Sequence, residues 1–345
     1  MNYSRFVLAL LALAAFTWLA PMVLPQYLVR VLIVMGINVI LVSSLGLSNG
    51  FTGVFSLGHV GFMALGAYSS GILTLELQKK LAYLPDLPGF LAGYSLPFLP
   101  ATLLAGLFCA ALAFVIGIPL MRLSGNYVSV ATLGFLVIVN NVLINAETIT
   151  RGARTFTGIP DYTNLPWVMG WLVVTLLVLS RIAYSPFGRA MRATREDGIA
   201  AQGVGIHVLP TRLIAFTIGA FFAGVGGALY AHYLVSFSPA TFFIAMMVTQ
   251  LTMLVLGGQA SLTGATLGVV IVTVLSELLR NLERGFNLGF VKLPAVFGAS
   301  QIALGLIFIL VMVFRPQGLF GDNEITLVSS GSSTSSGDRL KKEGV

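Results

Sequence analysis

Charged residues are scarce in this chain. They make up 9% of its 345 residues, compared with about a quarter in an average soluble domain, while hydrophobic residues make up 57%. Apolar runs long enough to cross a bilayer, about 20 residues each, follow one another from Phe6 almost to Arg315. The composition excludes an ordinary soluble domain and predicts a membrane protein.

Cysteine and histidine are almost absent too. The single cysteine, Cys109, lies in an apolar run, so no disulfide can form within the chain. The three histidines, His59, His207 and His232, are scattered, without the close spacing of metal ligands. We therefore predict no metal ion and no other cofactor.

Several sequence patterns that indicate nucleotide binding, catalysis or ion coupling are missing. No G-x-x-x-x-G-K-[ST] pattern occurs, so the chain lacks the usual phosphate-binding loop of an ATPase. No nucleophile and base pair is evident, and we predict no catalytic residue. Carboxylates stay out of the middle of the apolar runs, which weakens the case for an ion-coupled carrier. The net charge of +7 fits membrane topology and anionic lipid, and no basic patch with interleaved aromatics suggests nucleic acid.

The predicted fold is all-α, a polytopic membrane protein with about ten transmembrane helices. Continuous apolar runs favour helices over barrel strands, which alternate. The first run is expected to remain as an uncleaved helix, because Trp18 and Pro21 disfavour a signal cleavage site. The expected spans are roughly 6–24, 28–47, 51–77, 97–121, 127–146, 165–182, 213–235, 242–257, 262–279 and 293–314.

Lysine and arginine in short loops predict the orientation. With the 183–212 loop in the cytoplasm, both termini are cytoplasmic and eleven of the 19 basic residues lie inside: Arg5, Arg122, Arg181, Arg189, Arg192, Arg195, Arg212, Arg315, Arg339, Lys341 and Lys342. Residues 1–322 form one transmembrane domain. The Ser/Gly-rich residues 323–345 are expected to be a disordered tail.

Two places interrupt long apolar runs with glycine. "GFTGVFSLGHVGFMALGAYSSG" begins at Gly50 and "LGGQASLTGATLGVVIV" at Leu256, and in each Ser-Leu is soon followed by Gly. They suggest duplicated halves with interrupted helices, as in many transporters. Irregular backbone at membrane depth must face protein or water, so polar residues there are candidates for a translocation path: Asn49, Thr52, Ser56, His59, Gln259 and Ser261. Hydrogen bonding between helices is the alternative role, for His59 above all.

The run 213–235 carries small residues four apart, such as Gly219, Ala223 and Gly227. Such stripes let helix backbones approach closely in lipid. We expect packing within the chain rather than a contact between subunits.

Charge, glycine and helix-capping signals gather in "SPFGRAMRATREDGIAAQGVGI", residues 185–206. Ser185 and Pro186 suit a helix start, Thr194 followed by Asp197 resembles a second one, and glycines at 203 and 205 suit a stop. One or two short helices outside the membrane are predicted. Such a helix either docks in a partner or lies on lipid, held by its arginines.

The stretch from Ser185 to His232 resembles the loop and following helix of permease subunits of ABC importers for branched-chain amino acids, the LivM type. "NGFTGVFSLGHVGFMALGAYSSGIL", "VLGGQASLTGATLG", "SELLR" and "RPQGLFG" are similar to other landmarks of that family, and the match extends over roughly residues 28–321.

The resemblance implies a bacterial inner-membrane importer with two permease subunits, two cytoplasmic ATPases, and an extracytoplasmic binding protein that delivers leucine, isoleucine or valine. It also implies that residues 194–205 form a coupling helix seated in an ATPase. The candidate coupling residues are Arg192, Thr194, Arg195, Glu196, Asp197, Ala200, Ala201, Gly203 and Gly205.

Departures from the family pattern concern docking and substrate. Gly198 and Gln202 stand where the family often has acidic residues, and "TITRGARTFTGIP" lacks the usual T-G-G. The second break differs at Gln259, Ala260 and Ala265. A permease for urea, short amides or another amino acid is therefore the alternative within the class. A stand-alone channel or ion-coupled carrier is the alternative from another class.

Overall fold

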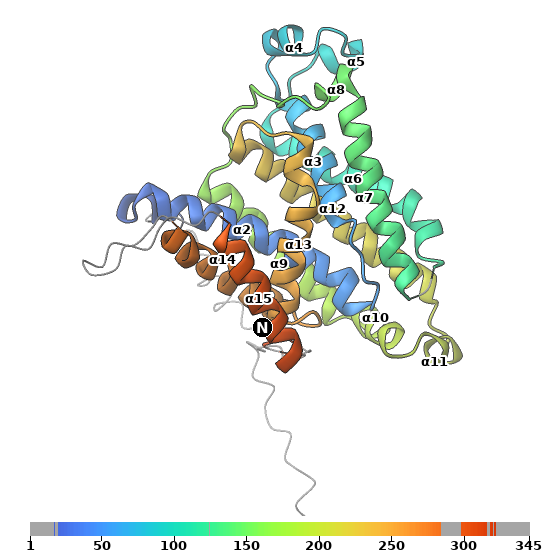
Figure 1. The fold of residues 1–345 in the computed structure, drawn as a ribbon. Helices are drawn as coiled ribbons and strands as arrows, with labels where there is room; N and C mark the ends of the chain where they lie inside the picture. The colour runs from blue at the N-terminus through green and yellow to red at the C-terminus, as the bar shows by residue number, and fades with distance from the viewer. Residues whose placement is uncertain are drawn as a thin grey trace, which may run out of the picture.

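The computed structural model describes residues 17, 20–123, 125–283, 298–315, 318, 319 and 321. This part of the chain is helical, and its only described extended pairing is a single antiparallel bridge between Phe156 and Phe237. The long helices are α2 (Gln26–Gly46), α3 (His59–Thr74), α6 (Phe98–Leu120), α7 (Asn126–Asn145), α9 (Leu165–Ala183), α12 (Val208–Leu234), α13 (Ile244–Gly257), α14 (Leu262–Glu283) and α15 (Ala299–Phe314) (Figure 1).

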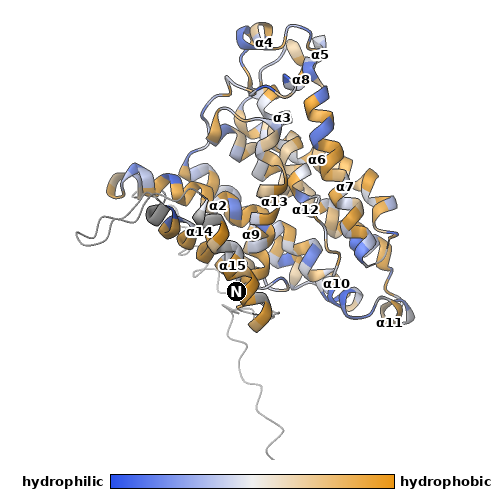
Figure 2. Ribbon diagram, viewed as in Figure 1, coloured by the Kyte–Doolittle hydropathy of each residue, from blue (hydrophilic) through white to orange (hydrophobic). Residues whose placement is uncertain are grey.

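Short elements lie at the two ends of the bundle. The helices α4 (Leu77–Tyr83), α5 (Gly89–Ala92) and α8 (Glu147–Thr150) lie at one end, and α10 (Pro186–Glu196) and α11 (Gly198–Gly203) at the other (Figure 1). A π-helical turn, η1 (Leu47–Phe51), ends α2, and a 3₁₀ turn, η2 (Pro239–Phe242), precedes α13. Figure 2 shows hydrophilic residues gathered at these two ends, with mainly hydrophobic helices between them. This pattern is the one expected of a bundle that crosses a bilayer.

Among the described residues, seven helical segments are long and apolar enough to cross a membrane, or eight if α3 and α4 count as one bent span. The predicted count of ten is not confirmed. Helices α3 and α15 have 16 residues each, about 24 Å at 1.5 Å per residue, less than the hydrocarbon core of about 30 Å. The predicted first span lies largely outside the described residues, and the tail lies wholly outside them.

The predicted single span 51–77 is wrong in detail. Residues 52–58 are not helical, α3 begins only at His59, and the chain bends by 117° between α3 and α4. Glycine-rich sequence and a left-handed residue, Gly53 with φ +70°, explain the interruption, since a β-carbon disfavours that conformation.

Helix α12 is the centre of the bundle and packs against α3, α6 and α2. Its small residues allow close approach: a β-carbon on Gly227 would lie 2.0 Å from the carbonyl oxygen of Met63, and one on Gly66 of α3 would lie 2.3 Å from the carbonyl oxygen of Gly224. The stripes on α12 are thus buried against neighbouring helices of the same chain, as predicted. Leucine, valine and phenylalanine from these helices fill the remaining core.

Candidate functional site

The first helix break is a closed loop held by one side chain. Asn49 donates from Nδ2 to the carbonyl oxygen of Ser56 at 3.2 Å, and its Oδ1 accepts the Ser56 N–H at 3.0 Å. Thr52 donates from Oγ1 to the Ser48 carbonyl at 2.7 Å. Backbone groups that leave the helix are therefore paired by polar side chains, as burial demands.

His59 opens α3 immediately after this loop. Its Nε2 lies 3.0 Å from Oγ of Ser44 on α2, and the Ser44 hydroxyl donates to the carbonyl oxygen of Leu41 at 2.9 Å. The His59 ring and the Ser44 hydroxyl are thus within hydrogen-bonding distance, and the tautomer of His59 decides which of the two donates. His59 therefore joins the two helices that flank the break.

The second break separates α13 from α14. Helix α13 ends at Gly257 and α14 begins at Leu262. Ser261, which is buried, accepts the Gly264 N–H at 3.1 Å with its Oγ, which is the capping role of a serine at a helix start. Gln259 lies within the break, between the end of α13 and the start of α14, and is partly exposed.

The two breaks touch each other. A β-carbon on Gly50 would lie 1.6 Å from the carbonyl oxygen of Gln259 and 3.1 Å from the backbone nitrogen of Ala260. Only a glycine at position 50 permits this approach. The predicted path residues of the first break, Asn49, Thr52, Ser56 and His59, are all buried. They thus belong to a segment in contact with the segment that holds Gln259 and Ser261.

The residues 185–206 form two short helices, as predicted. Ser185 accepts the Gly188 N–H at 3.2 Å at the start of α10, with Pro186 in the first position. Asp197 starts α11 by accepting the N–H groups of Ile199 and Ala200 at 2.8 and 3.1 Å. Beyond Gly203, which ends α11, Gly205 adopts φ +85°, so the glycine stop is confirmed.

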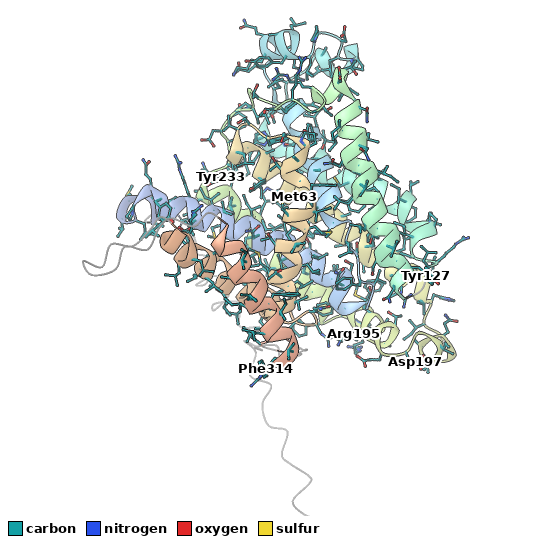
Figure 3. All side chains as sticks on the ribbon, viewed as in Figure 1. Met63, Tyr127, Arg195, Asp197, Tyr233 and Phe314 are labelled. Atoms are coloured by element: carbon teal, nitrogen blue, oxygen red, sulfur yellow. The ribbon has the colours of Figure 1, made fainter. Side chains whose placement is uncertain are left out.

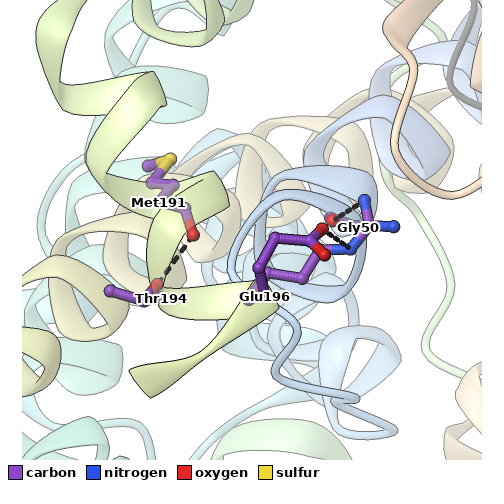
Figure 4. Close-up of polar contacts among 5 residues, drawn as sticks. Gly50, Met191, Thr194 and Glu196 are labelled. Carbon is purple, nitrogen blue, oxygen red and sulfur yellow. Dashed lines mark hydrogen bonds and ion pairs between the residues drawn. The ribbon is translucent and has the colours of Figure 1, made fainter. Parts of the chain in front are cut away.

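Thr194 was predicted to take part in the second helix start, and that prediction is wrong. Thr194 lies inside α10, is buried, and donates from Oγ1 to the Met191 carbonyl at 2.7 Å (Figure 4). The helix continues through Thr194 to Glu196, and only at Asp197 does the chain become extended, with φ −152°. The carboxylate of Asp197 alone therefore provides the cap.

Helix α11 has one buried face and one exposed face. Ala201 is 3% exposed and packs toward the protein, whereas Ile199 is 85% and Val204 77% exposed. Ala200 is on the exposed side. Sequence reasoning missed Ile199 and Val204. The available signal was that they are the only apolar residues larger than alanine between Asp197 and Gly205.

The end of α10 contacts the first break. Arg195 donates from Nη1 to the Gly50 carbonyl oxygen at 3.2 Å and forms an ion pair with Glu196, with 3.7 Å between Nε and Oε1 (Figure 4). The Arg192 guanidinium lies over the ring of Phe51, 5.4 Å from its centre. Figure 3 places Arg195 and Asp197 at the same end of the molecule as Tyr127, with Met63 in the middle of the bundle.

In the part of the chain that is described, the charged groups do not assemble a metal site. That part contains no cluster of three or more His, Cys, Asp or Glu side chains placed to hold a metal ion. One of the two short helices outside the bundle, α10, contacts the first helix break directly, and the first break contacts the second.

Comparisons with known proteins identify relatives of this chain. Residues 27–314 match the family described as the permease component of branched-chain amino acid transport systems. The chain is 31% identical to the high-affinity branched-chain amino acid transport system permease protein LivM of Escherichia coli (strain K12), over 92% of this chain and 75% of that protein.

More distant relatives share part of this length. The corresponding LivH protein of Salmonella typhimurium (strain LT2) is 29% identical over 54% of this chain and 62% of its own length. The autoinducer 2 import system permease protein LsrC of Escherichia coli O9:H4 (strain HS) is 26% identical over 65% of this chain and 64% of its own length. No solved structure matches the chain.

Proposed function

The chain belongs to the family of permease components of branched-chain amino acid transport systems, and we propose that it forms one half of the translocation path of an importer driven by separate ATPase subunits. It is a transport subunit and not an enzyme, a multi-pass protein of the inner membrane. A second permease subunit, two ATPases and a soluble binding protein complete the proposed assembly.

The proposed solutes are leucine, isoleucine and valine. This assignment rests on the likeness to LivM, which covers nearly the whole chain and a large part of that relative. The likeness to an autoinducer 2 import permease makes a comparison with other solutes part of the test.

The exposed face of α11 carries the proposed ATPase contact. Ile199 and Val204 present large apolar side chains to the surroundings, and Ala200 leaves space between them. A short helix with such a face fits a groove in a partner. The exposed apolar tip of α11, in a chain without a nucleotide-binding loop, is the observation that carries the proposed function.

The two breaks are the proposed moving part. Backbone that is not helical at membrane depth is tolerated where it is buried in protein or lines a water-filled cavity, and transporters build solute sites at such places. We assign Asn49, Thr52, Ser56, His59, Gln259 and Ser261 to the walls of the path in the open state. In the structure most of these side chains are satisfied by hydrogen bonds within the chain, as expected for a closed path.

ATP-driven movement requires that the ATPases bind the two states of the permease unequally, because a partner that binds both equally shifts neither. In the proposed cycle, ATP closes the ATPase dimer, α10 and α11 move with it, and the two breaks repack. The solute then passes from the binding protein to the cytoplasm.

The test is solute uptake into liposomes that contain the full-length chain with its partner permease and ATPases. Radiolabelled leucine should enter only when ATP and the binding protein are both present, and unlabelled isoleucine and valine should compete. Leucine flux through the permease subunits without ATPases would support a channel instead. Competition by urea or short amides, without competition by isoleucine or valine, would overturn the proposed solute.

A further inference from the structure

Arg195 contacts the first break at two places, Gly50 and Gly53. Its Nη1 donates to the Gly50 carbonyl, and its Cα, Cβ and Cγ lie 3.1–3.3 Å from where a β-carbon on Gly53 would be. Gly53 has φ +70°, so the turn after η1 is shaped to receive this side chain. The contact joins two residues that are 145 positions apart in the sequence.

A cation at this place is favourable for a general reason. The last carbonyl groups of a helix have no partner within the helix, and they carry the negative end of its dipole. Gly50 lies in η1, the π-helical end of α2. The guanidinium of Arg195 therefore both satisfies an end carbonyl and neutralises the helix end, as basic residues do at C-termini.

Arg192 contacts the same turn. It lies three residues before Arg195 on α10, so the two side chains share one face of the helix. Its guanidinium lies over the ring of Phe51, and its Nη2 is 3.5 Å from the Ala183 carbonyl at the end of α9. One face of α10 thus contacts the end of α2 at both Gly50 and Phe51.

The first break passes the contact on to the second. The Gln259 carbonyl occupies the space beside Gly50 that a side chain would fill, so neither backbone can advance without displacing the other. The second break is also fixed from the far side, where the Leu319 N–H donates to the Leu256 carbonyl at 2.9 Å. Direct contacts thus link Arg195 of α10 to Gly50 in the first break, and Gly50 to Gln259 in the break that precedes α14.

We propose that Arg195 is the positioning residue that carries movement of α10 and α11 to both helix breaks, through its bond to Gly50 and the contact of Gly50 with Gln259. The inference rests on the proposed function, because it names the link through which the ATPases act on the path. Arg195 contacts neither solute nor nucleotide in this role. It acts only through the backbone that it holds.

The experiment compares Arg195→Met with Arg189→Ala in the reconstituted importer. Methionine keeps an unbranched apolar stem against Gly53 but removes the donors and the charge. Arg189 lies on the exposed side of the same helix, so its replacement controls for the loss of a basic residue from α10. The readouts are the amount of ATPase bound, the rate of ATP hydrolysis, and the solute imported per ATP hydrolysed.

Arg195→Met should bind the ATPases and hydrolyse ATP as before, while the solute imported per ATP falls about tenfold, the effect of losing one charge-assisted hydrogen bond. Arg195→Lys, which keeps a cation and a donor, should recover part of the loss, and Arg189→Ala should match the unaltered protein. A ratio that stays unchanged in Arg195→Met, or a fall of hydrolysis and uptake in equal proportion, would overturn the inference.

Two outcomes separate this inference from the proposed function. If the unaltered protein shows no ATP-dependent uptake, the proposed function fails before any variant is considered. If the unaltered protein is active and Arg195→Met is coupled normally, only the role of Arg195 fails. Should Arg195→Met not fold, as judged by its elution in detergent, Arg195→Lys must show a lowered ratio on its own, and a normal ratio in that variant overturns the inference.

Discussion

Asn49 closes the first helix break by pairing with both backbone groups of Ser56, seven residues further on. The amide is suited to this task because it offers a donor and an acceptor at once. Both residues are buried, so water does not compete for these bonds. The break in this structure is consequently a loop closed by specific hydrogen bonds.

Replacing Asn49 with alanine should destabilise the permease. The variant leaves the N–H and carbonyl of Ser56 without this partner, at a cost of about 1–3 kcal/mol for such an unpaired buried group. Thermal unfolding of the purified protein in detergent measures the effect. Asn145→Ala is the matched control, because Asn145 lies exposed at the end of α7 and should unfold at nearly the original temperature. Equal midpoints for the two variants would show that the bonds to Ser56 contribute nothing.

Gly227→Ala should also destabilise the bundle. The new methyl group would meet the Met63 carbonyl at 2.0 Å, so α12 and α3 must move apart, at a cost typical of overpacking, about 1–3 kcal/mol. In Gly134→Ala on α7 the methyl group would meet nothing within 4 Å, and this variant should be unchanged or more stable by up to about 1 kcal/mol. Unfolding midpoints of the two variants should therefore move in opposite directions. A midpoint for Gly227→Ala at or above that of Gly134→Ala would contradict the close packing.

Local sequence signals were sufficient to predict those parts of the fold that depend on residues close together in the sequence. Apart from the span predicted at 51–77, the apolar runs overlap the long helices that the structure describes. Ser185 with Pro186 marked the start of α10 correctly. Glycine-rich stretches located both breaks. These features are set by helix propensity, capping and lipid exposure, which act over one or two turns.

Features that depend on distant parts of the chain were not predictable in this way. Nothing near Gly50 in the sequence indicates that the Gln259 carbonyl will lie against Gly50. Nor does it indicate that Arg195 will donate a hydrogen bond to the Gly50 carbonyl. Thr194 followed by Asp197 fitted a cap pattern, but tertiary packing buries Thr194 within α10. The burial of Ala201 and exposure of Ile199 likewise follow from how α11 lies on the bundle.

Lys80 provides a prediction about pH at the end of the molecule that carries α4. Its side chain is 1% exposed, and its Nζ donates to the Leu91 carbonyl at 2.8 Å and to that of Tyr94. Burial lowers the pKa of Lys80 below its usual value, near 10.4 in an exposed lysine. The unfolded chain therefore binds more protons than the folded chain between the two pKa values, so stability rises with pH in that window.

Lys80→Met removes this titration. As the pH rises through the alkaline range, the unfolding midpoint of the unaltered protein should increase relative to that of Lys80→Met. The reason is that the folded amine loses its proton at a lower pH than the unfolded amine and still donates to the two carbonyls. Lys79→Met is the control for the loss of a neighbouring lysine, because Lys79 is more exposed and forms an ion pair with Glu76 at 3.2 Å. A constant difference between the unaltered protein and Lys80→Met across the alkaline range would exclude a lowered pKa.

The two faces of α11 make opposite predictions for the same substitution. Ile199→Asp places a charge where the side chain already meets the surroundings, so folding should be unaffected while binding of the ATPases and uptake are lost. Ala201→Asp buries that charge against the bundle, at a cost of several kcal/mol per ion, so the permease itself should unfold at a lower temperature. Thermal unfolding of the permease alone, followed by capture of purified ATPase, separates the two effects. If Ile199→Asp binds ATPase normally, the exposed face of α11 is not the docking surface, since a charge in a desolvated apolar contact cannot be neutral to binding.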